Sequence, residues 1–149
     1  MQNITVILIS YLLLVGSCTT VSDEPLFDTT PVIEIISISN DTIVEFQESL
    51  HIIISYEDGD GDLGSPDPDE NTLFVKDNRL KKEDEYFVYP LAPYGESISI
   101  TGTLSIALNN TFILGNGTTE QTNFTIYMID RAGNKSNVVK TETITIVKP

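Results

Sequence analysis

The sequence is poor in the residue types from which many functional sites are built. It contains one cysteine, Cys18, one histidine, His51, and no tryptophan. A single cysteine excludes an intramolecular disulfide, so a hydrophobic core must stabilise the fold. Zinc sites need clusters of His or Cys ligands, and the sequence has none. His51 falls on the outward face of an expected strand and beside no nucleophile motif, so it does not indicate Ser–His–Asp or Cys–His catalysis.

Basic residues are also scarce. The chain has 8 Lys and Arg against 22 Asp and Glu, which gives a formal net charge of −14. Such a surface repels phosphate backbones, so we expect no nucleic-acid binding, and cations are its natural partners. The acidic residues are concentrated in turns, and so short a chain has few residues to line the deep cleft in which paired carboxylates hydrolyse glycosides. We therefore expect a protein that is not an enzyme.

The apolar N-terminal stretch Ile4–Gly16 is too short to span a bilayer. It has about 13 residues, whereas a spanning helix needs roughly 20, and its length is that of the apolar region of a signal peptide. The run Leu14-Val15-Gly16-Ser17-Cys18 resembles the lipobox of bacterial lipoproteins, in which the cysteine is acylated and becomes the mature N-terminus. The resemblance implies a lipoprotein signal peptide over residues 1–17 and a lipid on Cys18. The alternative is that Cys18 is a buried free thiol.

The rest of the chain divides into a tether and one domain. Residues 18–30 are polar, acidic and without periodicity, which predicts a flexible tether that follows the lipidated Cys18. Residues 31–149 suffice for a single domain. The expected location is the bacterial cell envelope, with the protein held on the outer membrane, periplasmic or surface-exposed, through its lipid.

Alternation of apolar and polar residues predicts that this domain is all-β. One segment, 97–108, directs alternate residues inward: Ile98, Ile100, Gly102, Leu104, Ile106 and Leu108. Gly102 indicates a bulge or a bend in that strand. A second segment, 50–56, directs Leu50, Ile52, Ile54 and Tyr56 inward. Further strands are expected at 32–38, 73–75, 86–91, 124–128 and 138–147, and no stretch has the 3.6-residue period of a helix.

Turn signals separate these segments, and about seven short strands indicate an immunoglobulin-like antiparallel β-sandwich. The segment Asp130-Arg131-Ala132-Gly133-Asn134 resembles the Asp-x-Ala-Gly-Asn turn near the C-terminus of many bacterial immunoglobulin-like domains. That turn joins the last two strands. Gly133 or Asn134 is expected to take the positive φ that a tight hairpin requires.

The segment Asp58-Gly59-Asp60-Gly61-Asp62-Leu63-Gly64 predicts a calcium loop. Three carboxylates at alternate positions repel one another, and the glycines let the backbone turn its carbonyl groups inward. Carboxylate and carbonyl oxygens are the ligands that Ca²⁺ takes. The segment departs from an EF-hand, because Leu63 replaces the loop glycine, Asp69 stands at the twelfth position and strands flank the loop. The alternative is an acidic, solvated turn without an ion.

Topology brings further carboxylates toward this loop. In an immunoglobulin-like sandwich the loop after the second strand and the loop between the last two strands lie at the same end. Asp130 is therefore expected near Asp58, Asp60 and Asp62. Asp69, together with Asp67 and Glu70, can close the site from the following segment.

The run Tyr56-Glu57-Asp58-Gly59-Asp60-Gly61-Asp62-Leu63-Gly64, with the lipobox before it and Tyr89-Pro90 and 100–104 after it, is similar to a group of small lipoproteins of Bacteroidota-type bacteria. The resemblance implies an outer-membrane-associated immunoglobulin-like domain on the secreted side, and it implies no activity.

Two functions remain open for such a chain. The first is a lipid-anchored binding or scaffolding module with a Ca²⁺-stabilised loop and a protein or glycan partner. The second is a carbohydrate-binding accessory protein of a glycan-uptake system, in which Tyr86, Tyr89 and Tyr94 stack on sugars. The simpler interpretation of these rings is a strand with core-facing and interface-facing side chains.

Overall fold

The computed structural model describes residues 27–93 and 95–149, and every helix or strand assigned there is a β-strand. The ten strands are β1 (Val32–Ile38), β2 (Thr42–Val44), β3 (Leu50–Asp58), β4 (Leu73–Asp77), β5 (Asp84–Tyr86), β6 (Ile100–Leu108), β7 (Thr119–Thr122), β8 (Phe124–Met128), β9 (Val139–Lys140) and β10 (Ile144–Val147). No helix in this part of the chain is long and apolar enough to cross a membrane. Cys18, the signal peptide, the first part of the tether and Tyr94 lie outside the described residues.

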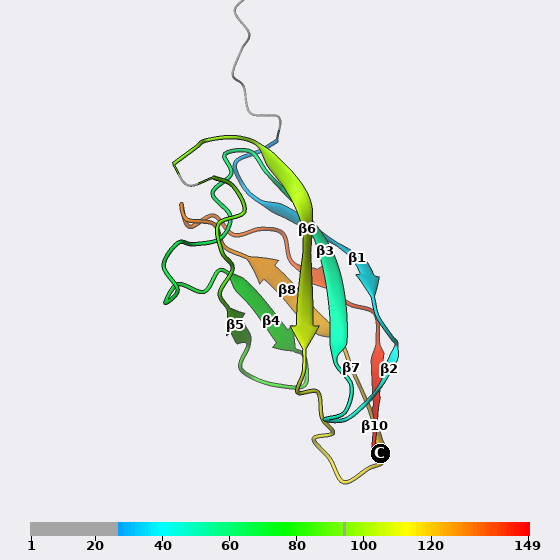
Figure 1. Cartoon of the computed structure of the whole chain (residues 1–149). Coiled ribbons are helices and arrows are strands. Elements are labelled where there is room, and N and C mark those ends of the chain that lie inside the picture. Colours follow the sequence, from blue (N-terminus) through cyan, green and yellow to red (C-terminus); the bar gives the residue numbers. More distant parts are fainter. Residues whose placement is uncertain (1–26, 94) are drawn as a thin grey trace, which may run out of the picture.

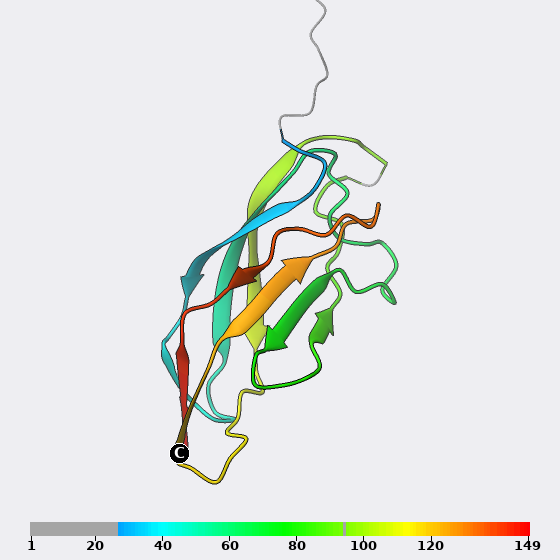
Figure 2. The ribbon, with the colours of Figure 1, turned by 180° about the vertical axis from the view of Figure 1, so that it is seen from behind.

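The strands form three sheets that pack together as a β-sandwich (Figures 1 and 2). One sheet has the order β1-β3-β6, the second β5-β4-β8-β9 and the third β2-β10-β7. Asn123 alone separates β7 from β8, and residues 141–143 separate β9 from β10. The pairs β8–β9 and β7–β10 are therefore successive parts of one long antiparallel hairpin. The predicted all-β sandwich is confirmed.

The alternation predicted for 50–56 places its part of the core correctly. Leu50, Ile52, Ile54 and Tyr56 of β3 are buried, while His51 is exposed on the opposite face. The register between β3 and β6 runs without interruption from Leu50 opposite Leu108 to Asp58 opposite Ile100. Facing strands of the other sheets complete the core with Leu73, Val75, Phe124, Ile126, Met128, Ile144 and Ile146.

The prediction of a bulge or a bend at Gly102 is wrong. Gly102 pairs with Tyr56 in the regular β3–β6 ladder, and a Cβ at Gly102 would lie 2.5 Å from the Tyr56 hydroxyl oxygen. The glycine therefore makes room for a ring of the neighbouring strand. The bulge of this sheet lies in β1, between Ile35 and Ser37.

The strand boundaries differ from the prediction. β6 begins at Ile100 instead of residue 97, and Ile98, which was predicted to point inward, is 44% exposed. The predicted strand 138–147 is divided into β9 and β10, and of 86–91 only Tyr86 is in a strand, at the end of β5. The backbone after β5 instead bonds to the end of the acidic loop, residues 58–64, and to the residue that follows it. The Ser65 N–H donates to the Val88 carbonyl at 2.9 Å, and the Leu91 N–H donates to the Leu63 carbonyl at 3.1 Å. β2 and β7 were not predicted from the sequence, because they are short and largely polar or flanked by turns.

The two ends of the sandwich carry different parts of the chain. Figure 1 shows the start of the described chain at the end where β3 finishes and β6 begins, and the C-terminus at the opposite end. The acidic loop follows Asp58, the last residue of β3. It therefore lies beside the first described residues, 27–31.

Candidate metal site

Glycines allow the segment after β3 to turn sharply while other segments press against it. Gly61 and Gly64 have φ values of +72° and +79°, which other residues rarely adopt. A Cβ at Gly59 would overlap the Phe27 carbonyl oxygen, and a Cβ at Gly61 would overlap that of Ile98. The alternating glycines therefore let the backbones of residues 27–28 and 98 contact the loop directly.

Leu63 fixes the far side of the loop. Its side chain is fully buried in the core, and its N–H donates to Asp58 Oδ2 at 3.2 Å. This bond closes the turn formed by residues 58–63. Because Asp58 belongs to β3 and Leu63 is held in the core, Asp58 and the two aspartates that follow it have a defined geometry.

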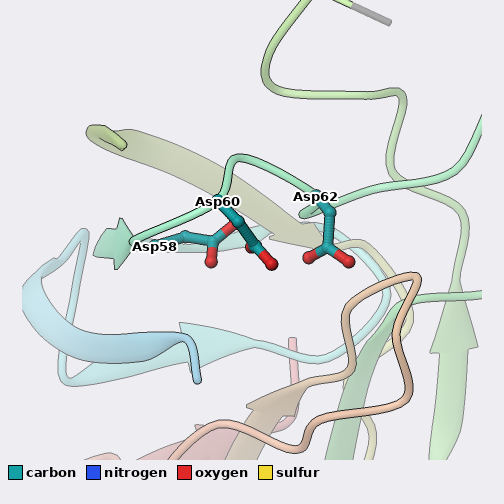
Figure 3. Close-up of side chains that lie close together, drawn as sticks. All are labelled: Asp58, Asp60 and Asp62. Carbon is teal, nitrogen blue, oxygen red and sulfur yellow. The ribbon is translucent and has the colours of Figure 1, made fainter. Parts of the chain in front are cut away.

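The carboxylates of Asp58, Asp60 and Asp62 converge on one small region (Figure 3). One oxygen of each lies within 4.8 Å of those of the other two. Asp58 is fully buried, and the other two are half-buried. The Oδ1 atoms of all three are buried and accept no hydrogen bond. A buried acceptor without a donor destabilises the fold by an amount on the order of 1–3 kcal/mol. Since the described residues provide no donor for these three oxygens, each of them has this destabilising effect.

The electrostatics of the cluster favour a bound positive charge. Burial, with the charges of Asp60 and Asp62, raises the pKa of Asp58 to about 6, against the lowering effect of the Leu63 N–H. Burial raises the pKa of Asp62 as well, and the charges of Asp130 and Asp60 add to this shift. Without a cation, the cluster therefore gains stability by binding a proton.

The predicted turn at 130–134 does lie against the acidic loop. The Arg131 N–H donates to the Asp62 carbonyl at 3.3 Å, and the Ala132 N–H donates to Asp62 Oδ2 at 2.9 Å. Gly133 has the expected positive φ, +88°. The convergence of these two loops, predicted from sandwich topology, is confirmed.

Arg131 is a residue of this site that the sequence analysis missed. Its guanidinium donates to the carbonyls of Gly64 and Gly61, at 2.9 and 3.3 Å. These bonds hold the loop backbone and leave the three Oδ1 atoms without a donor. Arg131 lowers the pKa of Asp62, but burial and the neighbouring carboxylates outweigh it. No sequence pattern signalled this role, since it depends on two loops about 70 residues apart.

Asp130 lies beside the cluster but is occupied by its own turn. It is buried, and its charge contributes to the raised pKa of Asp62. Its Oδ1 accepts the Asn134 N–H at 2.7 Å, and its Oδ2 accepts the Asn134 side-chain amide at 2.9 Å. Asp130 therefore shapes the turn that supports the site, outside the group of three converging carboxylates.

The structure does not bring Asp69 to the cluster. Asp69 is exposed, and its N–H donates to Asp67 Oδ1 at 3.0 Å. Glu70 accepts a hydrogen bond from the Ser65 hydroxyl at 2.7 Å. These acidic residues fold their own Pro-containing segment. Of the five predicted ligands, the structure thus assembles Asp58, Asp60 and Asp62.

The second predicted site lies along the side of the sandwich. Tyr86 and Tyr89 line one open groove of about 360 Å³ with Phe87 and with Leu104 of β6. Tyr89 is 72% exposed and Phe87 39%, whereas Tyr86 is half-buried, and burial raises its pKa. The rings that face solvent are therefore Tyr89 and Phe87, of which the sequence analysis named only Tyr89.

Comparisons with known proteins give no relative from which a function could be inferred, so the inference depends on the geometry of the loop. No known family, curated protein or solved structure matches the chain. The immunoglobulin-like type of the sandwich and the relationship to lipoproteins of Bacteroidota-type bacteria therefore stay predictions.

Proposed function

We propose that this chain is a lipid-anchored, non-enzymatic binding or scaffolding module of the bacterial cell envelope, with an immunoglobulin-like sandwich whose loop 58–62 binds Ca²⁺. One observation supports the cation: the carboxylates of Asp58, Asp60 and Asp62 converge, and one buried oxygen of each accepts no hydrogen bond. A divalent cation turns their mutual repulsion into attraction toward a common centre.

The donor set favours a hard cation. Asp58, Asp60 and Asp62 offer oxygen alone, the ligand type of Ca²⁺ and Mg²⁺, and no histidine or cysteine belongs to the described cluster. Ca²⁺ accepts irregular geometry and takes six to eight oxygens, so carbonyls and waters would complete its shell. Mg²⁺ demands a near-ideal octahedron, which suits a glycine-rich loop less well. An extracellular site of this kind is expected to bind with a Kd on the order of 10⁻⁴–10⁻³ M.

Isothermal titration of the cation-free chain with CaCl₂ tests this proposal, with Asp60→Asn as the disruptive variant. Asp69→Asn is the matched control, because Asp69 is an exposed aspartate of the same connection and lies outside the cluster. We expect wild type and Asp69→Asn to bind Ca²⁺ alike and Asp60→Asn to bind at least tenfold more weakly. Equal binding by all three proteins, or none by wild type, contradicts the proposal.

The anchor is supported by the sequence Leu14-Val15-Gly16-Ser17-Cys18. Acyl chains contribute about 0.8 kcal/mol per buried CH₂, so two or more hold a protein durably on a membrane. Expression in a bacterial host fed a clickable palmitate analogue should label wild type and leave Cys18→Ala unlabelled. A soluble, unlabelled wild-type protein would show that Cys18 carries no lipid and would contradict the proposed anchor.

Glycan binding is the second candidate function. It is favoured by the exposure of Tyr89 and Phe87 beside the open groove along β6, since exposed rings can stack on sugars. A glycan array probed with wild type and Tyr89→Ala tests it. Hits that the variant retains, or a lack of hits, count against this function.

A further inference from the structure

We infer that a cation bound by Asp58, Asp60 and Asp62 fastens the N-terminal segment 27–31 to the sandwich, so that the site works as a clamp between tether and domain. This inference rests on the proposed cation binding and adds a mechanical role to it. Its evidence is the position of Gly59, which lies between two of the three carboxylates.

Gly59 is the point at which the N-terminal segment touches the acidic loop. Its N–H donates to the Asp28 carbonyl at 2.8 Å. The Phe27 and Asp28 carbonyls lie where a Cβ of Gly59 would be, so the segment rests directly on the loop backbone. The peptide groups that carry Asp58 and Asp60 thus also carry the docking site for residues 27–28.

Within this segment, residues 28–30 are exposed, whereas Phe27 is half-buried and Pro31 is buried. Among the described residues, the Gly59–Asp28 hydrogen bond joins 27–30 to the rest of the sandwich. The bond from the Thr30 N–H to Asp28 Oδ1, 2.8 Å long, lies within the segment itself. Residues 27–30 also belong to the predicted tether, so the segment that contacts Gly59 is the last part of that tether.

The conformation of the loop depends on what cancels its negative charge. Glycine-rich backbone loses more conformational freedom on ordering than other sequences. Without a cation, the repulsion among the three carboxylates acts on this glycine-rich backbone, including the Gly59 peptide. With a cation, the carboxylates hold the loop in the shape that presents the Gly59 N–H to Asp28.

The two events are therefore thermodynamically linked. If cation binding favours docking of 27–31, docking must favour cation binding by the same factor, and such couplings are typically 5–150-fold. Gly59→Ala tests this reciprocity, because its methyl group displaces the Phe27 and Asp28 carbonyls while all three carboxylates remain. Gly115→Ala is the matched control, since a Cβ at Gly115 meets no atom within 4 Å.

The experiment is amide hydrogen exchange of the full-length chain with and without 5 mM CaCl₂, followed by NMR at the Gly59 amide and by mass spectrometry over 27–31. We expect Ca²⁺ to slow exchange at both places at least fivefold in wild type and Gly115→Ala, and to leave Asp60→Asn unchanged. We expect Gly59→Ala to bind Ca²⁺ at least fivefold more weakly than Gly115→Ala and to show no protection over 27–31.

The outcomes separate the clamp from the proposed function. Ca²⁺ binding by calorimetry without slower exchange at Gly59 or over 27–31 overturns the clamp and leaves the cation site standing. A lack of Ca²⁺ binding by wild type overturns both. If Gly59→Ala does not fold, the comparison of wild type with Asp60→Asn decides, because equal Ca²⁺-induced protection in the two would refute the clamp.

Discussion

Replacing Asp58 by asparagine should stabilise the cation-free protein and abolish its response to Ca²⁺. Asp58 is fully buried, and its Oδ1 has no donor. Asparagine has nearly the same shape, keeps an oxygen that can accept the Leu63 N–H and offers an amide N–H to Asp60. The substitution therefore removes a buried charge without opening a cavity.

The magnitude follows from the raised pKa. In the folded protein the pKa of Asp58 is about 6, against 3.8 for a fully solvated aspartate side chain. A group whose pKa is raised on folding stabilises the protein below its unfolded pKa and loses that contribution as the pH rises through its folded pKa. At pH 7.5 the ionised carboxylate therefore costs on the order of 3 kcal/mol, and about 1 kcal/mol of this remains at pH 4.5.

Urea denaturation in EDTA at pH 7.5 and pH 4.5 measures this difference directly. We expect Asp58→Asn to exceed wild type by roughly 2–3 kcal/mol at pH 7.5, with a smaller gain at pH 4.5. Adding 5 mM CaCl₂ should stabilise wild type and leave the variant unchanged, because the variant lacks one of the three charges.

The control is Asp69→Asn, which removes an exposed charge and should behave as wild type in all conditions. If Asp58→Asn were less stable than wild type at pH 7.5 in EDTA, the ionised Asp58 carboxylate would not be destabilising and the prediction would be refuted. A stability gain that does not depend on pH would equally show that ionisation of Asp58 is not its cause.

Three further predictions concern the sandwich and the site. Gly102→Ala should destabilise the protein by about 1–3 kcal/mol in urea denaturation, because the new methyl group meets the Tyr56 ring, and a change below 0.3 kcal/mol would contradict the packing. Asn137→Ala should lower the free energy of unfolding by about 1–2 kcal/mol in the same assay. The Asn137 side-chain amide accepts the Ile33 N–H at 2.8 Å and donates to the Ile33 carbonyl at 2.9 Å, and the variant loses both bonds. Unaltered stability would show that β1 does not need them. The Ca²⁺ affinity should fall as the pH drops through about 6, where Asp58 takes up a proton, and calorimetry that finds equal affinity at pH 7.5 and pH 5 would oppose this.

Much of the fold could be predicted from local pattern. The alternation in 50–56 and 100–108 places one face of each strand in the core, and these two strands pair without a break. β2 and β7 escaped prediction, because three or four residues with polar neighbours carry too little pattern. Gly102 was misinterpreted, since the reason for that glycine lies in a ring on the next strand.

The candidate site was predicted in part. Asp58, Asp60 and Asp62 are close in sequence, so their convergence needs only a tight turn. Asp130 comes near through sandwich topology, but its bonds to Asn134 occupy both of its oxygens. The docking of residues 27–28 on Gly59 involves partners about 30 residues apart, and no local signal marks it.

The sequence by itself determined the β-sandwich class, the buried faces of the main strands and the acidic character of one loop, because each of these depends on residues within a few positions of one another. Only the tertiary structure decided that one oxygen of each aspartate is buried without a donor, that Arg131 bonds loop carbonyls and that the N-terminal segment rests on the loop. The physical reason is that burial and hydrogen-bond completion are properties of all the segments that meet at a place. No single stretch of the chain contains them.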